Sequence, residues 1–169
     1  MSRAMRMTLW LLLLACAGFA PRAFAANEDC TVNASGVAFG TYDPGSATPL
    51  DGQGTVQVDC RGNAIVVNIT LGPGGSGSYA ARRMTNGTDN LFYNLYLDTN
   101  RTVVFGNGTG GSSAGPCTTG IGNSSTGCTS SNPNGSDRRA VRAIYGRVNA
   151  SQNVGVGTYT DTITYRVTF

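Results

Sequence analysis

The sequence contains neither histidine nor lysine, and charged residues make up only 12% of it. Serine and cysteine nucleophiles usually depend on one of those two side chains as their base, so the usual hydrolase arrangements are excluded. The nine acidic residues could still act in pairs, as in glycosidases. They are scattered, however, and Asp43, Asp89 and Asp98 lie among turn-forming residues, where aspartate is common for structural reasons. We therefore expect no catalytic residues and no enzyme activity.

Metal-binding patterns are lacking as well. No Cys-x-x-Cys pair occurs and no histidine accompanies the cysteines, so neither a metal nor another cofactor is expected. Four of the five cysteines follow the N-terminal leader. An even number in an exported chain favours disulfides, for which three pairings are possible. We expect Cys30 to pair with Cys60, joining neighbouring strands, and Cys117 to pair with Cys128, closing a short loop.

Residues 1–25 have the pattern of an export signal: a start with two arginines, an apolar run, and Ala-Phe-Ala before the cleavage point. The apolar run is shorter than the about 20 residues that a membrane span needs, so no integral membrane protein is expected. A competing interpretation is a lipoprotein signal, in which Leu13-Leu14-Ala15 precedes a lipidated Cys16. Cleavage after Ala25 leaves a mature domain of residues 26–169, which is 169 − 25 = 144 residues.

The mature domain is close to electrically neutral. Three of the twelve arginines lie in the signal, and the remaining nine balance the nine acidic residues. Nucleic-acid binding would call for a net basic face. We therefore expect no nucleic-acid partner.

After the signal, no stretch shows the 3.6-residue period of a helix, and short alternating runs are separated by glycine-rich turns. Six convincing strands, and a first strand at residues 30–40 that is interrupted near Ser35-Gly36, predict an all-β antiparallel sandwich of the immunoglobulin type. Residues 56–71 are expected to form a hairpin around Arg61-Gly62-Asn63. Residues 106–137, which are almost without apolar side chains, are expected to be the least ordered part.

The last stretch, residues 157–169, is expected to be a core strand. From residue 162 onward, polar and apolar residues alternate strictly. Each inward side chain would contribute roughly 1.5–3 kcal/mol on burial, yet no further strand follows to pair with this edge, which natural sheets normally cap or charge. We expect the missing strand to come from another molecule by β-strand addition. The face that would contact it consists of Ile163, Tyr165, Val167 and Phe169.

An ordered series of motifs across the mature chain resembles the spore coat protein U domain family, which includes the pilin subunits of archaic chaperone-usher pili. These motifs are Phe39-Gly40-Thr41-Tyr42-Asp43, Val56-Gln57-Val58-Asp59-Cys60, Arg83-Met84, Leu91-Phe92-Tyr93-Asn94-Leu95-Tyr96-Leu97-Asp98, Tyr145-Gly146-Arg147-Val148, Gln152-Asn153, Gly157-Thr158-Tyr159-Thr160-Asp161 and Val167-Thr168-Phe169.

The resemblance implies an incomplete immunoglobulin-like sandwich that lacks its final strand. It also implies a periplasmic pilus chaperone that lends a strand during export, an outer-membrane usher, and neighbouring pilin subunits that donate N-terminal strands. The protein would then be an exported structural subunit, carried through the periplasm to the cell surface or a pilus, or secreted. By the same correspondence, the inward face of residues 163–169 lines the acceptor groove.

One feature departs from the family pattern. Shaft pilins carry alternating apolar residues before the first cysteine, whereas only Ala26-Asn27-Glu28-Asp29 precede Cys30 here. We hypothesise a subunit that accepts a strand without donating one, at a tip or terminal position or in a secreted relative that does not polymerise.

Two alternative functions go with the same fold. One is a self-contained secreted or coat protein whose groove is closed by its own chain. The other is a carbohydrate-binding adhesin domain, to which the loop aromatics Tyr42 and Tyr79 lend little support. The loop at residues 106–137 is either a binding surface or a solvated insertion.

Overall fold

A computed structural model describes residues 29–120 and 127–169. The expected export signal and Cys16 lie outside these residues. The described residues form one short 3-10 turn, η1 (Gly74–Ser76), and nine strands: β1 (Cys30–Ala38), β2 (Leu50–Arg61), β3 (Val66–Leu71), β4 (Arg83–Thr85), β5 (Asn90–Tyr96), β6 (Gly115–Thr118), β7 (Cys128–Ser131), β8 (Asp137–Val148) and β9 (Tyr165–Thr168). No helix in these two ranges has the length and apolar character of a membrane span.

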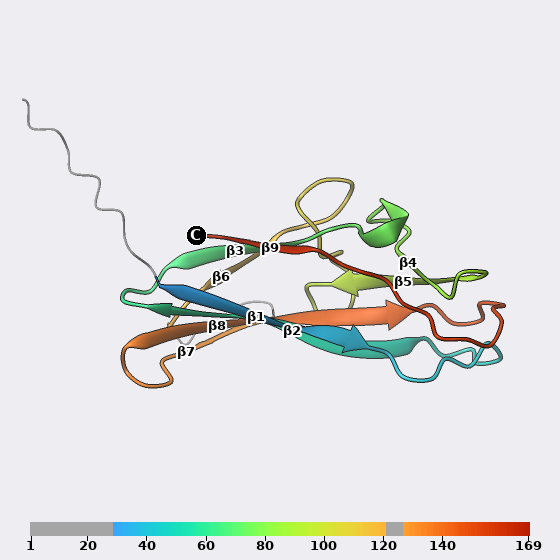
Figure 1. The fold of residues 1–169 in the computed structure, drawn as a ribbon, viewed down its shortest axis with the longest axis horizontal. Coiled ribbons are helices and arrows are strands. Elements are labelled where there is room, and N and C mark those ends of the chain that lie inside the picture. The colour runs from blue at the N-terminus through green and yellow to red at the C-terminus, as the bar shows by residue number, and fades with distance from the viewer. Residues whose placement is uncertain (1–28, 121–126) are drawn as a thin grey trace, which may run out of the picture.

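The strands form two antiparallel sheets that face each other (Figure 1). The larger sheet has the order β1-β2-β8-β5-β4, and the smaller sheet has the order β6-β3-β9. β8 is long enough to pair with β5 along one half, where Tyr93 lies opposite Val148, and with β7 along the other, where Cys128 lies opposite Arg142. The predicted all-β sandwich is therefore confirmed.

The expected hairpin of residues 56–71 is wrong. β2 pairs with β1 and β8 in the larger sheet, while β3 pairs with β6 and β9 in the smaller one. Gly62, with a φ of 98°, helps the chain to turn from one sheet to the other. Val58 and Ile69, both fully buried, therefore belong to opposite layers of the core. Two alternating strands joined by a short turn have the same local pattern in either arrangement.

The expected break in the first strand is present. The pairing of β1 with β2 shifts register between Ser35 and Ala38. Val37, within this bulge, and Phe39, beyond it, lie over glycines of β2 and β8, and a Cβ atom on Gly146 would come within 2.7 Å of both side chains. The missing glycine side chains therefore let the end of β1 lie against the inner face of the larger sheet.

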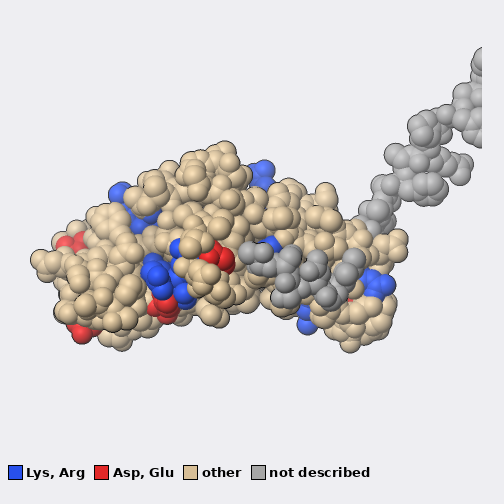
Figure 2. All heavy atoms as spheres, turned by 180° about the vertical axis from the view of Figure 1, so that it is seen from behind, with Lys and Arg blue, Asp and Glu red and all other residues tan. Residues whose placement is uncertain are grey.

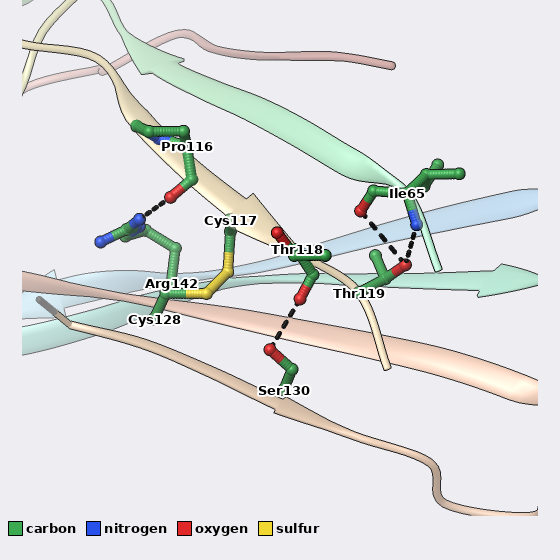
Figure 3. Close-up of a disulfide and its surroundings, with 8 residues drawn as sticks. All are labelled: Ile65, Pro116, Cys117, Thr118, Thr119, Cys128, Ser130 and Arg142. Carbon is green, nitrogen blue, oxygen red and sulfur yellow. Dashed lines mark hydrogen bonds between the residues drawn. A yellow bond between two sulfur atoms is a disulfide. The ribbon is translucent and has the colours of Figure 1, made fainter. Parts of the chain in front are cut away.

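The described residues of the stretch 106–137 are more ordered than the sequence predicts, because they include β6 and β7. The Cys117–Cys128 disulfide joins these strands and thereby ties the smaller sheet to the larger one (Figure 3). Ser130 supports the same connection by donating a hydrogen bond to the carbonyl of Thr118 at 2.6 Å. Both cysteines are buried, so the disulfide takes the place that apolar side chains occupy elsewhere in the core. Cys30 pairs with Cys60 between β1 and β2, so both disulfides follow the pairing expected from the sequence.

Charged side chains on the described surface compensate one another locally. Arg147 makes two hydrogen bonds to the carboxylate of Asp51, and Arg139 makes two to Asp59, in both cases between β8 and β2. Seen from behind, the described residues show small groups of charges among mostly uncharged surface (Figure 2). The hydrogen bond from Arg147 lowers the pKa of Asp51.

Candidate functional site: an open groove beside the terminal strand

The C-terminal segment crosses from one sheet to the other. Thr160 exchanges backbone hydrogen bonds with Thr85 of β4, at 3.0 and 3.1 Å, in the larger sheet. Four residues later, the carbonyl of Thr164 accepts a hydrogen bond of 2.7 Å from the amide of Gly72, at the end of β3 in the smaller sheet. The regular strand β9 is therefore shorter than the sequence predicts, because residues 160–164 are used for this crossing.

One edge of β9 is open. The amide of Leu71 donates a hydrogen bond to the carbonyl of Gly106, on the side of β3 that faces away from β9. The amide of the next residue, Gly72, donates to the carbonyl of Thr164, on the side that faces the C-terminal segment. Because backbone groups alternate in direction along an antiparallel pair, Tyr165 and Val167 direct their N–H and C=O groups away from β3. Within residues 29–120 and 127–169, no strand pairs with that edge.

The side chains of this segment alternate as predicted, but the inward face is only partly covered. Ile163 and Val167 are half-buried and pack against the core. Tyr165 is 41% exposed and Phe169 is 64% exposed, although both lie in the inward register. An inward face with this much exposed aromatic surface indicates that part of the sandwich is uncovered.

The uncovered region is an apolar groove between the end of β1 and the C-terminal segment. It consists of a first hollow of about 380 Å³ and a second of about 560 Å³, which share Val37, Phe39, Met84 and Tyr159. The floor of the first hollow is the inner face of the larger sheet, with Val56 of β2, Leu95 of β5 and Ile144 of β8. We call the two hollows together the open groove.

The four predicted contact residues lie differently in this groove. Ile163 and Tyr165 line the first hollow. Val167 and Phe169 continue the same face along β9 but line neither hollow. The sequence did not predict that β1 forms the opposite wall, with the small residues Ala34 and Gly36, because a bulge does not reveal the path that follows it.

A polar pair lies in the first hollow. Among the described residues that line the two hollows, Asp161 is the only one with a charge. One of its carboxylate oxygens accepts hydrogen bonds from the amides of Gly75 and Thr162, at 2.9 and 2.8 Å. The other accepts a hydrogen bond of 2.7 Å from the hydroxyl of Tyr93. Burial, together with this hydrogen bond, raises the pKa of Tyr93 far above its usual range, so the phenol remains a donor.

A fully buried arginine supports the wall behind this pair. The guanidinium of Arg82 donates to the carbonyls of Gly72 and Phe105, both at 2.7 Å, and to the side chain of Asn94 at 2.8 Å. It also lies 5.1 Å from the centre of the Tyr79 ring. Burial lowers the pKa of Arg82. The sequence pattern alone does not distinguish the buried Arg82 from the exposed Arg83.

The two loop aromatics considered for carbohydrate binding have internal roles. The hydroxyl of Tyr42 donates to the carbonyl of Asn149 and accepts from the amide of Gln152. The hydroxyl of Tyr79 donates to the carbonyl of Leu71. Among the described residues, no group of three potential metal-binding side chains is gathered in one place.

Comparisons with known proteins agree with this architecture. The family model described as Spore Coat Protein U domain matches residues 20–166. "Protein U" of Myxococcus xanthus is 38% identical over 144 residues, covering 78% of this chain and 70% of its own length. Among solved structures, a chain of the complex between the chaperone CsuC and the tip adhesion subunit CsuE, from archaic chaperone-usher Csu pili of Acinetobacter baumannii, matches with a TM-score of 0.52. That match has 21% identity over 84% of this chain, and this chain spans only 40% of the matched one.

Proposed function

Because the chain belongs to the spore coat protein U domain family, whose members are structural subunits and not enzymes, we propose that it is an exported subunit of a surface pilus or coat. The subunit would be assembled by accepting a β-strand from another polypeptide. The observation that carries the proposal is the open edge of β9, which adjoins an apolar groove. Backbone groups of Tyr165 and Val167 would pair with the added strand. Its alternate side chains would fill the two hollows.

The physical reason for strand addition is the combination of two unmet requirements at one place. An unpaired edge presents hydrogen-bonding groups that a new strand can satisfy. Each apolar side chain that enters the groove would contribute roughly 1.5–3 kcal/mol by leaving water. In this proposal, Ile163 and Tyr165 contact the added strand in the first hollow, and Val167 and Phe169 contact its continuation along β9.

The partners follow from the same mechanism. A periplasmic pilus chaperone would supply the strand during export, an outer-membrane usher would conduct the subunit to the surface, and a neighbouring subunit would supply the final strand. The similar solved structure, described as a pre-assembly complex of a chaperone with a tip subunit, supports this order of events by analogy of fold. The two disulfides, each between strands, suit an exported protein.

We further propose a tip or terminal position. The expected cleavage after Ala25 leaves four residues before Cys30, and two of them, Glu28 and Asp29, are acidic. Such a segment offers no alternating apolar side chains to fill a second subunit's groove. Mass spectrometry of the exported protein tests this step, because a mature N-terminus well before Ala26 would remove its basis.

Strand acceptance is tested by thermal unfolding of the purified mature protein with a synthetic peptide that matches the donor segment of a co-encoded subunit. We expect a clear rise in the unfolding temperature. Tyr165→Asp, in the inward register, should abolish the rise, whereas Thr168→Asp, on the exposed opposite face, should retain it. A protein that is stable alone and shows no rise would instead be a self-contained domain of the same fold.

A further inference from the structure

The polar pair Tyr93 and Asp161 poses a specific problem for a strand that fills the open groove. The first hollow is otherwise lined mainly by apolar side chains such as Val56, Leu71 and Ile144. Asp161 is half-buried, and Tyr93 is only 6% exposed. A strand that covers the hollow would remove the remaining water from the carboxylate. Burying a charge is unfavourable unless hydrogen bonds replace those to water.

The chain's own groups leave acceptor capacity on this pair. An ionised carboxylate can accept about four hydrogen bonds, and from the described residues Asp161 accepts three, from Gly75, Thr162 and Tyr93. The Tyr93 hydroxyl donates its proton to Asp161, so its oxygen can accept in turn. In the described part of the chain, no arginine forms an ion pair with Asp161. The guanidinium of Arg82 is directed instead to Gly72, Phe105 and Asn94.

From this geometry, and resting on the proposed function, we infer that the strand of a neighbouring subunit presents a hydrogen-bond-donating side chain to Asp161 at one inward position. Serine, threonine, asparagine or lysine would supply the N–H or O–H group. At every other inward position an apolar side chain is preferred, because the surrounding hollow is apolar. The pair would thereby fix the register of the incoming strand, since a shift along the groove would bury the donor among apolar groups and leave the carboxylate without it.

The test is a positional scan with synthetic peptides of about ten residues that alternate valine and threonine. In each peptide of the series, one inward valine is replaced by serine, and the dissociation constant for the purified mature protein is measured. We expect serine to weaken binding at every inward position except one, where binding is about tenfold tighter than for the other serine peptides or better. In the Asp161→Asn variant, the peptide with serine at that position should bind no more tightly than the other serine peptides.

Asp89→Asn is the matched control, because Asp89 also holds a backbone amide, that of Gly155, but lines neither hollow. In Asp89→Asn, the same serine peptide should still bind about tenfold more tightly than the other serine peptides. Thermal unfolding without peptide establishes that each variant is folded. A scan in which valine binds best at every inward position would overturn this inference while leaving strand acceptance intact. The inference would also be overturned if one serine peptide still bound more tightly than the others to Asp161→Asn. If the parent peptide, with valine at every inward position, failed to bind, the proposed function itself would be overturned.

Discussion

Replacement of the buried arginine by an apolar residue of similar length should strongly destabilise the sandwich. In Arg82→Met, the carbonyls of Gly72 and Phe105 lose their charged donor. Asn94 loses one donor as well, but its side-chain oxygen still accepts from the amide of Leu95. Each carbonyl left without a partner costs about 1–3 kcal/mol, so the two together predict a loss of about 2–6 kcal/mol in the free energy of unfolding. Release of a buried charge offsets part of that loss.

Arg83→Met is the matched control, because Arg83 is the next residue and is exposed. Its substitution should change the free energy of unfolding by about 0.5 kcal/mol or less. Urea denaturation followed by far-ultraviolet circular dichroism measures both variants, with unchanged slopes establishing that the comparison is valid. If Arg82→Met were as stable as Arg83→Met, the buried guanidinium would not be holding β3 and the loop at Phe105 together.

Three further predictions concern the disulfide, acid stability and the shape of the groove. Cys117→Ser with Cys128→Ser opens a loop whose closure entropy is worth about 3 kcal/mol, so the double variant should unfold at a lower urea concentration, and an unchanged midpoint would contradict the cross-sheet role of this bond. The hydrogen bond from Arg147 lowers the pKa of Asp51 below its ordinary 3.8, so the stability that this ionised carboxylate contributes is complete above about pH 4 and is lost as the pH falls through the folded-state pKa. Asp51→Asn should therefore make the free energy of unfolding depend less steeply on pH below about pH 4. The same dependence in wild type and variant would refute the stabilising role of the Arg147–Asp51 pair. Gly146→Ala places a Cβ atom within 2.7 Å of Phe39 and Val37. This should displace both side chains into the open groove and weaken the binding of the donor peptide. An unchanged affinity for the peptide would show that the end of β1 moves freely.

The sequence predicts which faces are buried better than it predicts which strands are neighbours. In β2 and β5, buried residues alternate with more exposed ones along the strand, as the alternation of apolar and polar residues indicates, because burial of one face acts on each strand locally. Alternation could not show that β3 belongs to the opposite sheet, since the partner of a strand depends on the path of the whole chain. The cysteine pairing succeeded for β1 and β2 because those strands are adjacent in the sequence and in the sheet.

Buried polar residues escaped prediction for a related reason. Arg142 occupies an inward position of β8, between the buried Ala140 and Ile144, and donates a hydrogen bond to the carbonyl of Pro116 (Figure 3). A strand pattern normally assigns arginine to the solvent face, and the acceptor on β6 helps to explain the inward position of Arg142. Asp161 likewise belongs to a recognisable motif, but its contact with Tyr93, 68 residues away in the chain, exists only in the folded sandwich.

Amide hydrogen exchange at single residues measures whether a second polypeptide pairs with the open edge of β9. In the protein alone, the amides of Tyr165 and Val167 should exchange rapidly, while Arg166 and Thr168, which face β3, should be protected. With a bound donor peptide, the amides of Tyr165 and Val167 should become protected, while the β3-facing amides change little. Protection of Tyr165 and Val167 before any peptide is added, or rapid exchange that persists in the complex, would contradict strand addition at this edge.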